Sequence, residues 1–411
     1  AGKPIIQYNI EALRDCGVKD ILLIVGYKEE IVRDYFKDGS QLGVNISYAT
    51  QSKLEGTADA IGYGKDFIED SLITLNGDII LDVDILSEII EDYEESKPDT
   101  LMVLTEVEDP SAFGVVELDG DKVINIVEKP KREEAPSNLI NTGIYIFNKD
   151  IFDKIDKTEV SPRGEYEITD SLSLQIADGK VVKGHKTTKE WMDIGKPWEL
   201  IEINEELLNN IEGEIKGTVE EGVTIHGEVF LDEGSLLRSG VYIKGPVYIG
   251  KNCDIGPNSY IRGNSYFGDN VHIGNAVEIK NSIIMENTNV SHLSYVGDSI
   301  LGSNCNIAAG TNIANLRFDN KTVKTTIKNK KTDTGRRKLG AIVGDSVKTG
   351  INSSLSPGVK IGVRATIGSG VLLYEDLESD MRVLVKQEHI YQNKKETGQI
   401  SLEEAEDNKE E

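Results

Sequence analysis

Residues 247–274 read VYIGKNCDIGPNSYIRGNSYFGDNVHIG, and a large apolar side chain returns in them at every sixth position. The same phase extends along the chain in both directions. Its members are Ile225, Leu231, Leu237, Ile243, Ile249, Ile255, Ile261, Phe267, Ile273 and Ile279. So short a repeat buries its apolar residues by stacking each one on its counterpart one coil away. The stretch therefore predicts a β-solenoid.

The six-residue period changes register once. After Ile279 it resumes at Leu301, and 301 minus 279 is 22, which is not a multiple of six. His292 falls between these two residues. From Leu301 to Leu373 the phase is constant, even across residues 314–342, so these residues are predicted to form an insertion that leaves the coils in register. We interpret the shifted segment and the insertion together as an active site carried by the solenoid.

Charge separates the insertion from the rest of the chain. The net charge of −26 over 411 residues argues against binding of nucleic acid or of an anionic membrane by the surface as a whole. Residues 314–342, by contrast, carry nine Lys and Arg against two Asp, a balance of +7. Two interpretations stay open for them, a solvated charged loop and a phosphate site.

Cysteine spacing and a search for targeting and membrane-spanning patterns predict where in the cell the protein is located. The three cysteines, Cys16, Cys253 and Cys305, are far apart and show no disulfide or zinc spacing. We find no signal-peptide pattern and no apolar run long enough to span a membrane. A cytoplasmic location is expected.

The first half of the chain alternates short apolar runs with amphipathic segments. Strands are expected at 20–27 and 44–51, each followed by a helix, and a buried strand ending in Asp78 is followed by a helix at 84–96. Later segments, among them EYEITDSLSL (165–174), are also assigned as strands. Such alternation predicts a parallel sheet whose ligands collect at the carboxyl ends of its strands. Asp78 is interpreted either as a Mg²⁺ ligand or as a turn or cap residue.

Six short motifs follow one another in this half. They are Gln51 with Gly56-Thr57-Ala58-Asp59-Ala60, Asn76-Gly77-Asp78, Phe113-Gly114, Glu128-Lys129-Pro130, Asn141-Thr142-Gly143 and Trp191-Met192-Asp193. In this order they resemble the sugar-1-phosphate nucleotidylyltransferases, a family with a Rossmann-like α/β fold. Each motif alone is weak, and the order of all six is what carries the resemblance.

The resemblance implies a role for each matched residue. Gln51 and Gly56 would recognise a pyrimidine base, with Thr57 beside them. Asp78 and Asp193 would bind Mg²⁺. The sugar would be held by Gly114, Glu128 and Asn141, and its phosphate by Lys129. The implied reaction is in-line attack of a sugar phosphate on the α-phosphorus of UTP or dTTP, which depends on positioning and charge neutralisation rather than on a covalent nucleophile.

The start of the chain departs from the family pattern. Family members begin with a strand and a Gly-rich loop whose Arg and Lys cradle the triphosphate. This chain begins at Ala1-Gly2-Lys3-Pro4, and this Lys-Pro matches a later Lys-Pro of the family. We therefore expect weak or absent nucleotidylyl transfer from the chain as given.

The solenoid also carries a family pattern. Arg262, Lys280, His292-Leu293-Ser294-Tyr295, Asn306 and Asn315 follow the spacing of the acetyltransferase domain of the bifunctional GlmU-type enzymes. Beyond Asn315 the residues look more like the archaeal-type enzymes than the bacterial ones. The resemblance implies a left-handed parallel β-helix with about three hexapeptides per coil.

His292 is the candidate general base, because imidazole titrates near neutral pH. From position alone it could equally be a surface residue. The resemblance implies that it takes a proton from the amine of an amino-sugar phosphate as that amine attacks acetyl-CoA. Tyr295, Asn306 and Asn315 would hold the sugar. Its phosphate would meet Arg262, Lys280, Lys321 and Lys324, and backbone groups at Ala309 and Ala341 would line the pantetheine path.

Three segments are expected. These are a nucleotidyltransferase-like domain at 1–212, a β-helix acetyltransferase domain at 213–375, and capping strands with an acidic, disordered tail at 376–411. The favoured function is acetylation of glucosamine-1-phosphate followed by Mg²⁺-dependent uridylyl transfer to give UDP-N-acetylglucosamine, in a homotrimer with sites between neighbouring columns. Two alternatives stay open. The first is a nucleotidylyltransferase that uses dTTP, UTP or GTP with another sugar phosphate and whose solenoid serves only for oligomerisation. The second is a non-catalytic regulatory or exchange-factor-like subunit. The sequence does not decide whether the amino sugar is glucosamine or galactosamine, or whether the nucleotide is UTP or dTTP.

Overall fold

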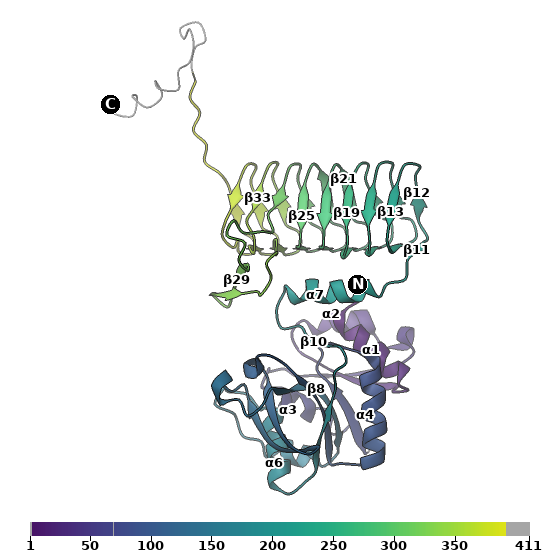
Figure 1. The fold of residues 1–411 in the computed structure, drawn as a ribbon, viewed down its shortest axis with the longest axis vertical. Helices are drawn as coiled ribbons and strands as arrows, with labels where there is room; N and C mark the ends of the chain where they lie inside the picture. The colour runs from purple at the N-terminus through teal and green to yellow at the C-terminus, as the bar shows by residue number, and fades with distance from the viewer. Residues whose placement is uncertain (1, 69, 392–411) are drawn as a thin grey trace, which may run out of the picture. The chain divides into compact units, whose positions relative to one another are not determined.

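The computed structural model describes residues 2–68 and 70–391, so the predicted disordered segment at 401–411 lies outside the described residues. The chain divides into two compact units, Lys3–Leu200 and the part from Ile201 onward together with the first residues. Each unit is described by itself (Figure 1). Among the described residues, no helix combines the length and the apolar character needed to cross a membrane.

The first unit is built on a six-stranded mixed sheet. In spatial order its strands are β3 (Ser71–Leu75), β8 (Leu139–Asn148), β5 (Thr100–Glu106), β9 (Val182–Lys186), β7 (Lys122–Glu128) and β6 (Gly114–Asp119). Two small sheets accompany it, β1 (Asp20–Val25) parallel to β2 (Asn45–Thr50), and β4 (Ile79–Leu81) antiparallel to β10 (Trp191–Asp193).

The prediction of a parallel sheet is wrong for the six-stranded sheet. Its pairs are antiparallel except β5 with β9 among the described strands. One physical reason is the hairpin that joins β6 to β7, where Gly120 adopts a φ of +67°. A tight turn of this kind returns the chain beside itself and so pairs neighbouring strands antiparallel.

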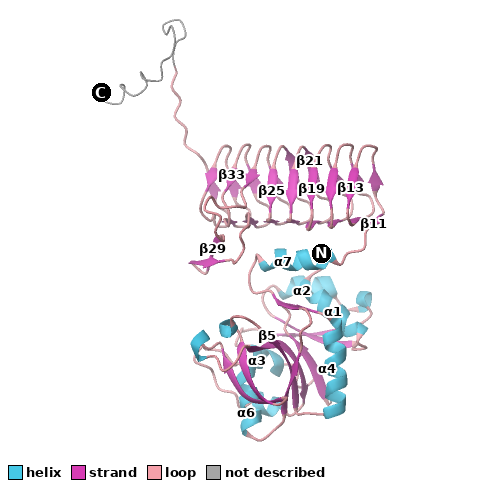
Figure 2. Ribbon diagram, viewed as in Figure 1, coloured by secondary structure: helices cyan, strands magenta, loops and turns pink. Residues whose placement is uncertain are grey.

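Helices pack on these sheets (Figure 2). They are α1 (Ile5–Asp15), α2 (Glu29–Phe36), α3 (Thr57–Gly62), α4 (Val83–Ser96), α5 (Ile151–Ile155) and α6 (Ile168–Ala177), with the short 3₁₀ turns η1 (Ser40–Leu42), η2 (Pro110–Ala112) and η3 (Arg132–Glu134). Helices α2 and α4 confirm the expected ones. The strand expected at 165–174 is wrong: α6 occupies it, because its buried residues, Ile168, Thr169, Ser171, Leu172 and Gln175, recur at the three- and four-residue spacing of a helix face.

The second unit begins within helix α7 (Glu199–Asn209) and is otherwise a solenoid of three parallel sheets, which confirms the predicted left-handed parallel β-helix. Sheet I contains β11 (Glu214–Ile215), β14 (Val229–Leu231), β17 (Val247–Ile249), β20 (Ser265–Phe267), β23 (Ile283–Ile284), β26 (Ile300–Leu301), β31 (Ile342–Val343) and β34 (Lys360–Ile361). Sheet II contains β12 (Thr218–Val219), β15 (Leu236–Leu237), β18 (Asp254–Ile255), β21 (His272–Asn275), β24 (Asn289–His292), β27 (Asn306–Ile307), β32 (Lys348–Thr349), β35 (Thr366–Ile367) and β37 (Arg382–Val383). Sheet III contains β13 (Thr224–His226), β16 (Tyr242–Lys244), β19 (Tyr260–Arg262), β22 (Glu278–Lys280), β25 (Tyr295–Gly297), β28 (Asn312–Ile313), β33 (Ser354–Leu355) and β36 (Leu372–Leu373).

The six-residue anchors form the core of this unit. Ile243, Ile261, Ile279, Val296 and Ile313 lie in successive strands of sheet III, and each is fully buried. Thr349, the polar anchor in the later phase, is buried as well, and its Oγ1 accepts a hydrogen bond from the Ala308 N–H at 2.9 Å. The apolar period therefore fixes which side chain of each strand points inward.

The register change consists of two shortened corners between sheet III and sheet I. Phe267 pairs with Ile284 and Ile284 with Leu301, so each of these coils has 17 residues (267 to 284, 284 to 301) where the preceding one has 18 (249 to 267). The first short corner lies between Ile279 and Ile284, and the second between Val296 and Leu301. His292 belongs to the stretch between the two shortened corners, on a different corner of the coil.

The predicted insertion leaves the solenoid at the same kind of corner, one coil later. It runs from the end of β28 to the start of β31 and contains the antiparallel hairpin of β29 (Lys324–Ile327) and β30 (Lys330–Asp333). Leu301 pairs with Val343 across it, so the register is kept, as predicted. Three successive corners between sheets III and I are thus irregular.

Candidate functional site

His292 is the last residue of β24 and its side chain is exposed. Its main chain is held firmly: the carbonyl oxygen accepts hydrogen bonds from Ser294 Oγ at 2.8 Å and from the Gly310 N–H at 3.1 Å. Leu293 follows with a φ of +48°, which turns the chain from sheet II into sheet III. This turn fixes the backbone position from which the His292 side chain extends.

A pocket of about 380 Å³ opens beside His292 on sheet II. Its lining residues are Glu220, Arg238, Asp254, Gly256, Pro257, His272, Gly274, Asn275 and His292. Arg238 donates two hydrogen bonds to Asp254, at 2.6 and 2.8 Å, and these bonds lower the pKa of the Asp254 carboxyl. His272 lies in this wall with Nδ1 3.8 Å from Asp254 Oδ2.

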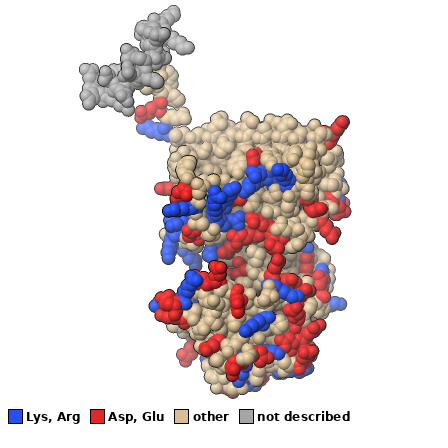
Figure 3. Space-filling view, viewed as in Figure 1, with Lys and Arg blue, Asp and Glu red and all other residues tan. Residues whose placement is uncertain are grey.

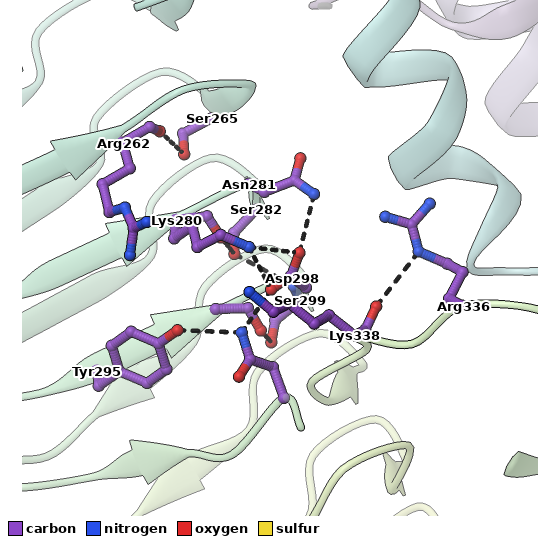
Figure 4. A network of polar contacts seen from close by, with 12 residues as sticks. Arg262, Ser265, Lys280, Asn281, Ser282, Tyr295, Asp298, Ser299, Arg336 and Lys338 are labelled. Atoms are coloured by element: carbon purple, nitrogen blue, oxygen red, sulfur yellow. Dashed lines mark hydrogen bonds and ion pairs between the residues drawn. The ribbon is translucent and has the colours of Figure 1, made fainter. Parts of the chain in front are cut away.

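Three of the predicted substrate-binding residues, Arg262, Lys280 and Tyr295, lie on sheet III (Figure 4), and Asn315 follows β28 and contacts Tyr295. Arg262 is in register with Lys280, and Lys280 with Gly297. Asn315 Nδ2 donates to Tyr295 Oη at 3.0 Å. Burial, and after it the nearby negative charge of Asp298, raises the pKa of the Tyr295 hydroxyl. The hydroxyl is therefore kept neutral and able to donate.

The cations of this face already have acidic partners. Arg262 Nη1 lies 3.1 Å from Glu278 Oε1, and both side chains are partly exposed. Lys280 Nζ lies 2.9 and 2.8 Å from the two oxygens of Asp298; the aspartate is almost completely buried and the lysine partly exposed. Sequence reasoning missed Asp298. The signal that could have found it is its spacing of about one coil from Lys280.

The insertion adds further positive charge, and Figure 3 shows Lys and Arg gathered over the hairpin and the adjoining face of the solenoid. Lys321 and Lys324 are exposed. Arg336, near the end of the insertion, is largely buried and pairs with two carboxylates of helix α7, Glu202 at 3.0 Å and Glu205 at 2.7 Å. These two ion pairs anchor the insertion within its own unit.

The remaining predicted residues of this site lie elsewhere on the solenoid. Asn306 is exposed on sheet II, in register with Asn289. Ala309 is partly exposed in the turn after β27, and its carbonyl accepts from the Asn352 N–H at 2.9 Å. Ala341 is fully buried, with its N–H donating to Ser299 Oγ and its carbonyl accepting from the Ile300 N–H. Its backbone groups are thus engaged inside the coil.

In the first unit, the structure places Asp78 close to Asp193. Asp78 lies in the connection between β3 and β4 rather than at the end of β3, and its carbonyl accepts from the Ile194 N–H at 2.9 Å. Partial burial, and then the negative charge of Asp78, raise the pKa of Asp193 from 3.8 to about 6. A divalent cation would relieve the repulsion between these two carboxylates.

The predicted base-recognition residues surround the start of helix α3. Gln51 is buried and its Nε2 donates to Asp59 Oδ2 at 2.7 Å and to the Gly56 carbonyl at 3.2 Å. Gly56 has a φ of +119°, and a Cβ there would lie 2.4 Å from the Tyr166 carbonyl oxygen. Thr57 Oγ1 accepts from the Ile168 N–H at 3.0 Å. Close backbone approach therefore explains the glycine.

The predicted sugar-binding residues also lie together. A Cβ on Gly114 would lie 3.1 Å from Glu128 Oε2 and 3.7 Å from Asn141 Cβ. Asn141 donates to the buried Tyr145 hydroxyl, and Lys129 Nζ lies 3.8 Å from Glu128 Oε1. Sequence reasoning missed Arg163, whose Nη1 lies 3.2 Å from the same oxygen of Glu128.

Models of known protein families match both units of the chain. The model of the nucleotidyl transferase family matches residues 1–210, and the bacterial transferase hexapeptide model matches residues 218–263. The model of the GMPPB C-terminal domain matches residues 243–349. The fold and its sites thus define a transferase that joins a nucleotidyltransferase domain to a hexapeptide β-helix.

Relatives along nearly the whole chain narrow this class. The Bifunctional protein GlmU of Methanococcus maripaludis is 46% identical over 396 residues, and that of Methanocaldococcus jannaschii 44%, each covering 96% of this chain and 93% of the relative. A Bifunctional sugar-1-phosphate nucleotidylyltransferase/acetyltransferase of Sulfurisphaera tokodaii is 43% identical over 91% of this chain and 90% of its own length. The chain belongs to the GlmU family of bifunctional transferases, in its archaeal form.

Proposed function

We propose that the β-helix unit acetylates the amino group of glucosamine-1-phosphate with acetyl-CoA, and that the first unit transfers a uridylyl group from UTP to the product, giving UDP-N-acetylglucosamine. The observation that carries the proposal is the gathering of Arg262, Lys280, Tyr295 and Asn315 on one face of the solenoid. His292 ends β24, three residues before Tyr295 begins β25. Cationic and hydrogen-bonding groups of this kind suit a sugar phosphate.

In the acetylation, the neutral amine nitrogen attacks the thioester carbonyl carbon, the carbon–sulfur bond breaks, and the CoA thiolate leaves. His292 accepts the proton that the attacking nitrogen loses. A base is needed because the nitrogen must shed this proton to form a stable amide. Tyr295, Asn306 and Asn315 would orient the sugar, and Arg262, Lys321 and Lys324 would attract its phosphate. Ala309 would border the pantetheine, whereas the burial of Ala341 lends its proposed role no support.

In the nucleotidylyl transfer, Asp78 and Asp193 would hold Mg²⁺, which when bound neutralises negative charge on the nucleotide phosphates. The raised pKa of Asp193 supports this assignment, because it comes from partial burial and then from the negative charge of the Asp78 carboxylate nearby. Gln51, Gly56 and Thr57 would recognise the pyrimidine base. Gly114, Glu128 and Asn141 would position the sugar, with Lys129 at its phosphate.

The proposal includes a homotrimer formed by the β-helix, to which such solenoids lend themselves, and a cytoplasmic location. A nucleotidylyltransferase with a merely oligomerising solenoid, and a non-catalytic subunit, are not favoured, because relatives over nearly the whole chain are named as bifunctional.

One experiment tests the proposal as a whole. The chain is incubated with acetyl-CoA and a panel of amino-sugar phosphates, with and without UTP or dTTP and Mg²⁺, and the products are identified by mass. Acetylation of glucosamine-1-phosphate is expected, and galactosamine-1-phosphate is the informative competitor. Failure to acetylate any member of the panel would refute the acetyltransferase assignment.

A further inference from the structure

Asp298 lies at the second shortened corner, where several polar side chains meet. Its side chain is 3% exposed. Its carboxylate accepts from Lys280 Nζ at 2.9 and 2.8 Å, from Asn281 Nδ2 at 3.0 Å, and from Asn315 Nδ2. A buried carboxylate is costly unless its charge is paired and its oxygens are hydrogen-bonded. Here both conditions are met by side chains of adjacent coils.

The backbone of the corner holds this carboxylate in place. Asp298 has a φ of +49° and Asn281, in the preceding short corner, a φ of +47°. Short polar side chains tolerate this left-handed region better than most. The Asp298 N–H donates to the Lys280 carbonyl at 2.8 Å, and its carbonyl accepts from the Gly340 N–H at 2.8 Å. Each of these two corners is one residue shorter than the corresponding corner of the preceding coil, and these contacts stack one corner directly on the next.

We propose that Asp298 is a positioning residue for the sugar phosphate at the acetyltransferase site, an inference that rests on the proposed function. Two of its partners, Lys280 and Asn315, are residues assigned to the substrate. Because the carboxylate is buried, it acts through them rather than by touching the substrate. Its charge offsets that of Lys280, so the pair presents little net charge. Attraction of the phosphate then falls to the insertion lysines and to Arg262, whose pair with Glu278 is partly exposed and therefore screened by water. Lys280 and Asn315 supply fixed donors.

The same cluster is tied to the insertion. Asn281 Nδ2 also donates to Glu205 Oε1 at 2.7 Å, and that oxygen accepts from Arg336 Nη2 at 2.7 Å. Figure 4 shows Arg336 facing the cluster from the insertion. A chain of contacts therefore runs from Asp298 through Asn281 and Glu205 to Arg336. Loosening the cluster should loosen the base of the insertion that carries Lys321 and Lys324.

A structural role and a positioning role make different kinetic predictions. A residue that only supports the fold lowers stability, and the folded molecules that remain keep their Michaelis constants. A positioning residue for the sugar phosphate raises the KM for that substrate while the KM for acetyl-CoA stays unchanged, because interactions with one substrate alone are lost.

The test compares Asp298→Asn with Asp345→Asn in the full chain. Asp345 is the matched control, since it is a turn carboxylate of the same solenoid whose side chain accepts from the Ser303 N–H at 2.9 Å rather than from a residue of the cluster. For Asp298→Asn we expect the KM for glucosamine-1-phosphate to rise at least about tenfold and the KM for acetyl-CoA to change by less than about twofold. Asp345→Asn should resemble the wild type in both constants.

A second variant guards against a folding defect. Asn281→Gly keeps the left-handed backbone and removes the amide that joins Asp298 to Glu205, so it should raise the same KM in the same direction. Wild-type values of this KM in both variants, in an enzyme that acetylates the substrate normally, overturn the inference and leave the proposed function standing. Equal rises in the KM for glucosamine-1-phosphate and the KM for acetyl-CoA would also overturn the inference. A wild-type chain that neither binds nor acetylates the sugar phosphate overturns the proposed function and this inference with it.

Discussion

Gly297 leaves open the space that the Tyr295 hydroxyl occupies: a Cβ on Gly297 would lie 2.4 Å from Tyr295 Oη and 2.7 Å from Asn315 Nδ2. Gly297 continues the column of Arg262 and Lys280 on sheet III, where a side chain would point outward. Its missing side chain lets the ring of Tyr295 lie over the strand and meet Asn315. The glycine is thus required by a close approach of two proposed substrate-binding groups.

Gly297→Ala is expected to displace the Tyr295 hydroxyl and Asn315 together. Atoms cannot approach to 2.4 Å without a shift of one of them, and the tyrosine side chain is the group free to move. The KM for the amino-sugar phosphate should rise, with a smaller loss of thermal stability. Steady-state acetylation kinetics and thermal unfolding of the same preparation check this.

Tyr295→Phe separates the hydroxyl from the ring. It keeps the ring over Gly297 and removes only the acceptor for Asn315 Nδ2. We expect a rise in the same KM that is smaller than that of Gly297→Ala. Gly297→Ala with unchanged kinetics would show that the packing of Tyr295 is irrelevant to the substrate.

The stability of the first unit should depend on the ionisation of Asp193. Its pKa in the folded chain is about 6, above its ordinary value of 3.8, so the folded state holds the proton more tightly than the unfolded state does. The resulting stability is fully present below about pH 4 and is lost as the pH rises through 6. In metal-free buffer, Asp193→Asn should therefore raise the melting temperature above pH 6 and have little effect at pH 4. Asp119→Asn, at an exposed hairpin turn, serves as the control; a gain that did not vary with pH would contradict the account.

Binding of Mg²⁺ should depend on the same proton. Metal binding requires the deprotonated carboxylate, so each bound ion displaces a proton from Asp193 wherever the pH lies below its pKa. Affinity measured by calorimetry, with UTP present, should increase between pH 5 and 7. Asp78→Asn should weaken it at both values. Binding that is equally strong at the two pH values would argue against Asp193 as a ligand.

The sequence predicted the solenoid because its signal is local and repeated. An apolar residue at every sixth position can be buried in few other ways, and Ile243, Phe267 and Val343 are buried as the period requires. The first unit was harder to predict. Antiparallel pairing of distant strands such as β3 with β8 leaves no periodic mark, and the helix at Ile168–Ala177 begins with residues that also favour strands. The two-residue Gly120-Asp121 turn between β6 and β7 was a readable hairpin signal.

The residues of the candidate site also fall into two groups, those that the sequence predicted and those that it did not. Residues in a recognisable spacing, such as Lys280 and Tyr295, could be predicted from the sequence and do lie on one face. Asp298 was missed, because its spacing from Lys280 is informative only once one coil is known to stack on the next through a corner that is one residue short. The burial of Ala341 was hidden for a similar reason: it lies at the very end of the insertion, and the sequence does not show that the coil closes over it.

Oligomeric state offers an independent check. If the proposed sites lie between neighbouring columns, the active species should sediment as a trimer. Activity and sedimentation measured at the same protein concentrations should rise together on assembly. A fully active monomer would refute this part of the proposal.

The most direct measurement is the rate of acetylation of glucosamine-1-phosphate by His292→Ala beside His272→Ala. Both histidines line the same pocket, so the second variant controls for changes to its wall. Loss of the general base should lower kcat roughly 10²- to 10⁴-fold in His292→Ala, with a much smaller effect in His272→Ala. A His292→Ala enzyme that keeps a near-normal rate would contradict the account.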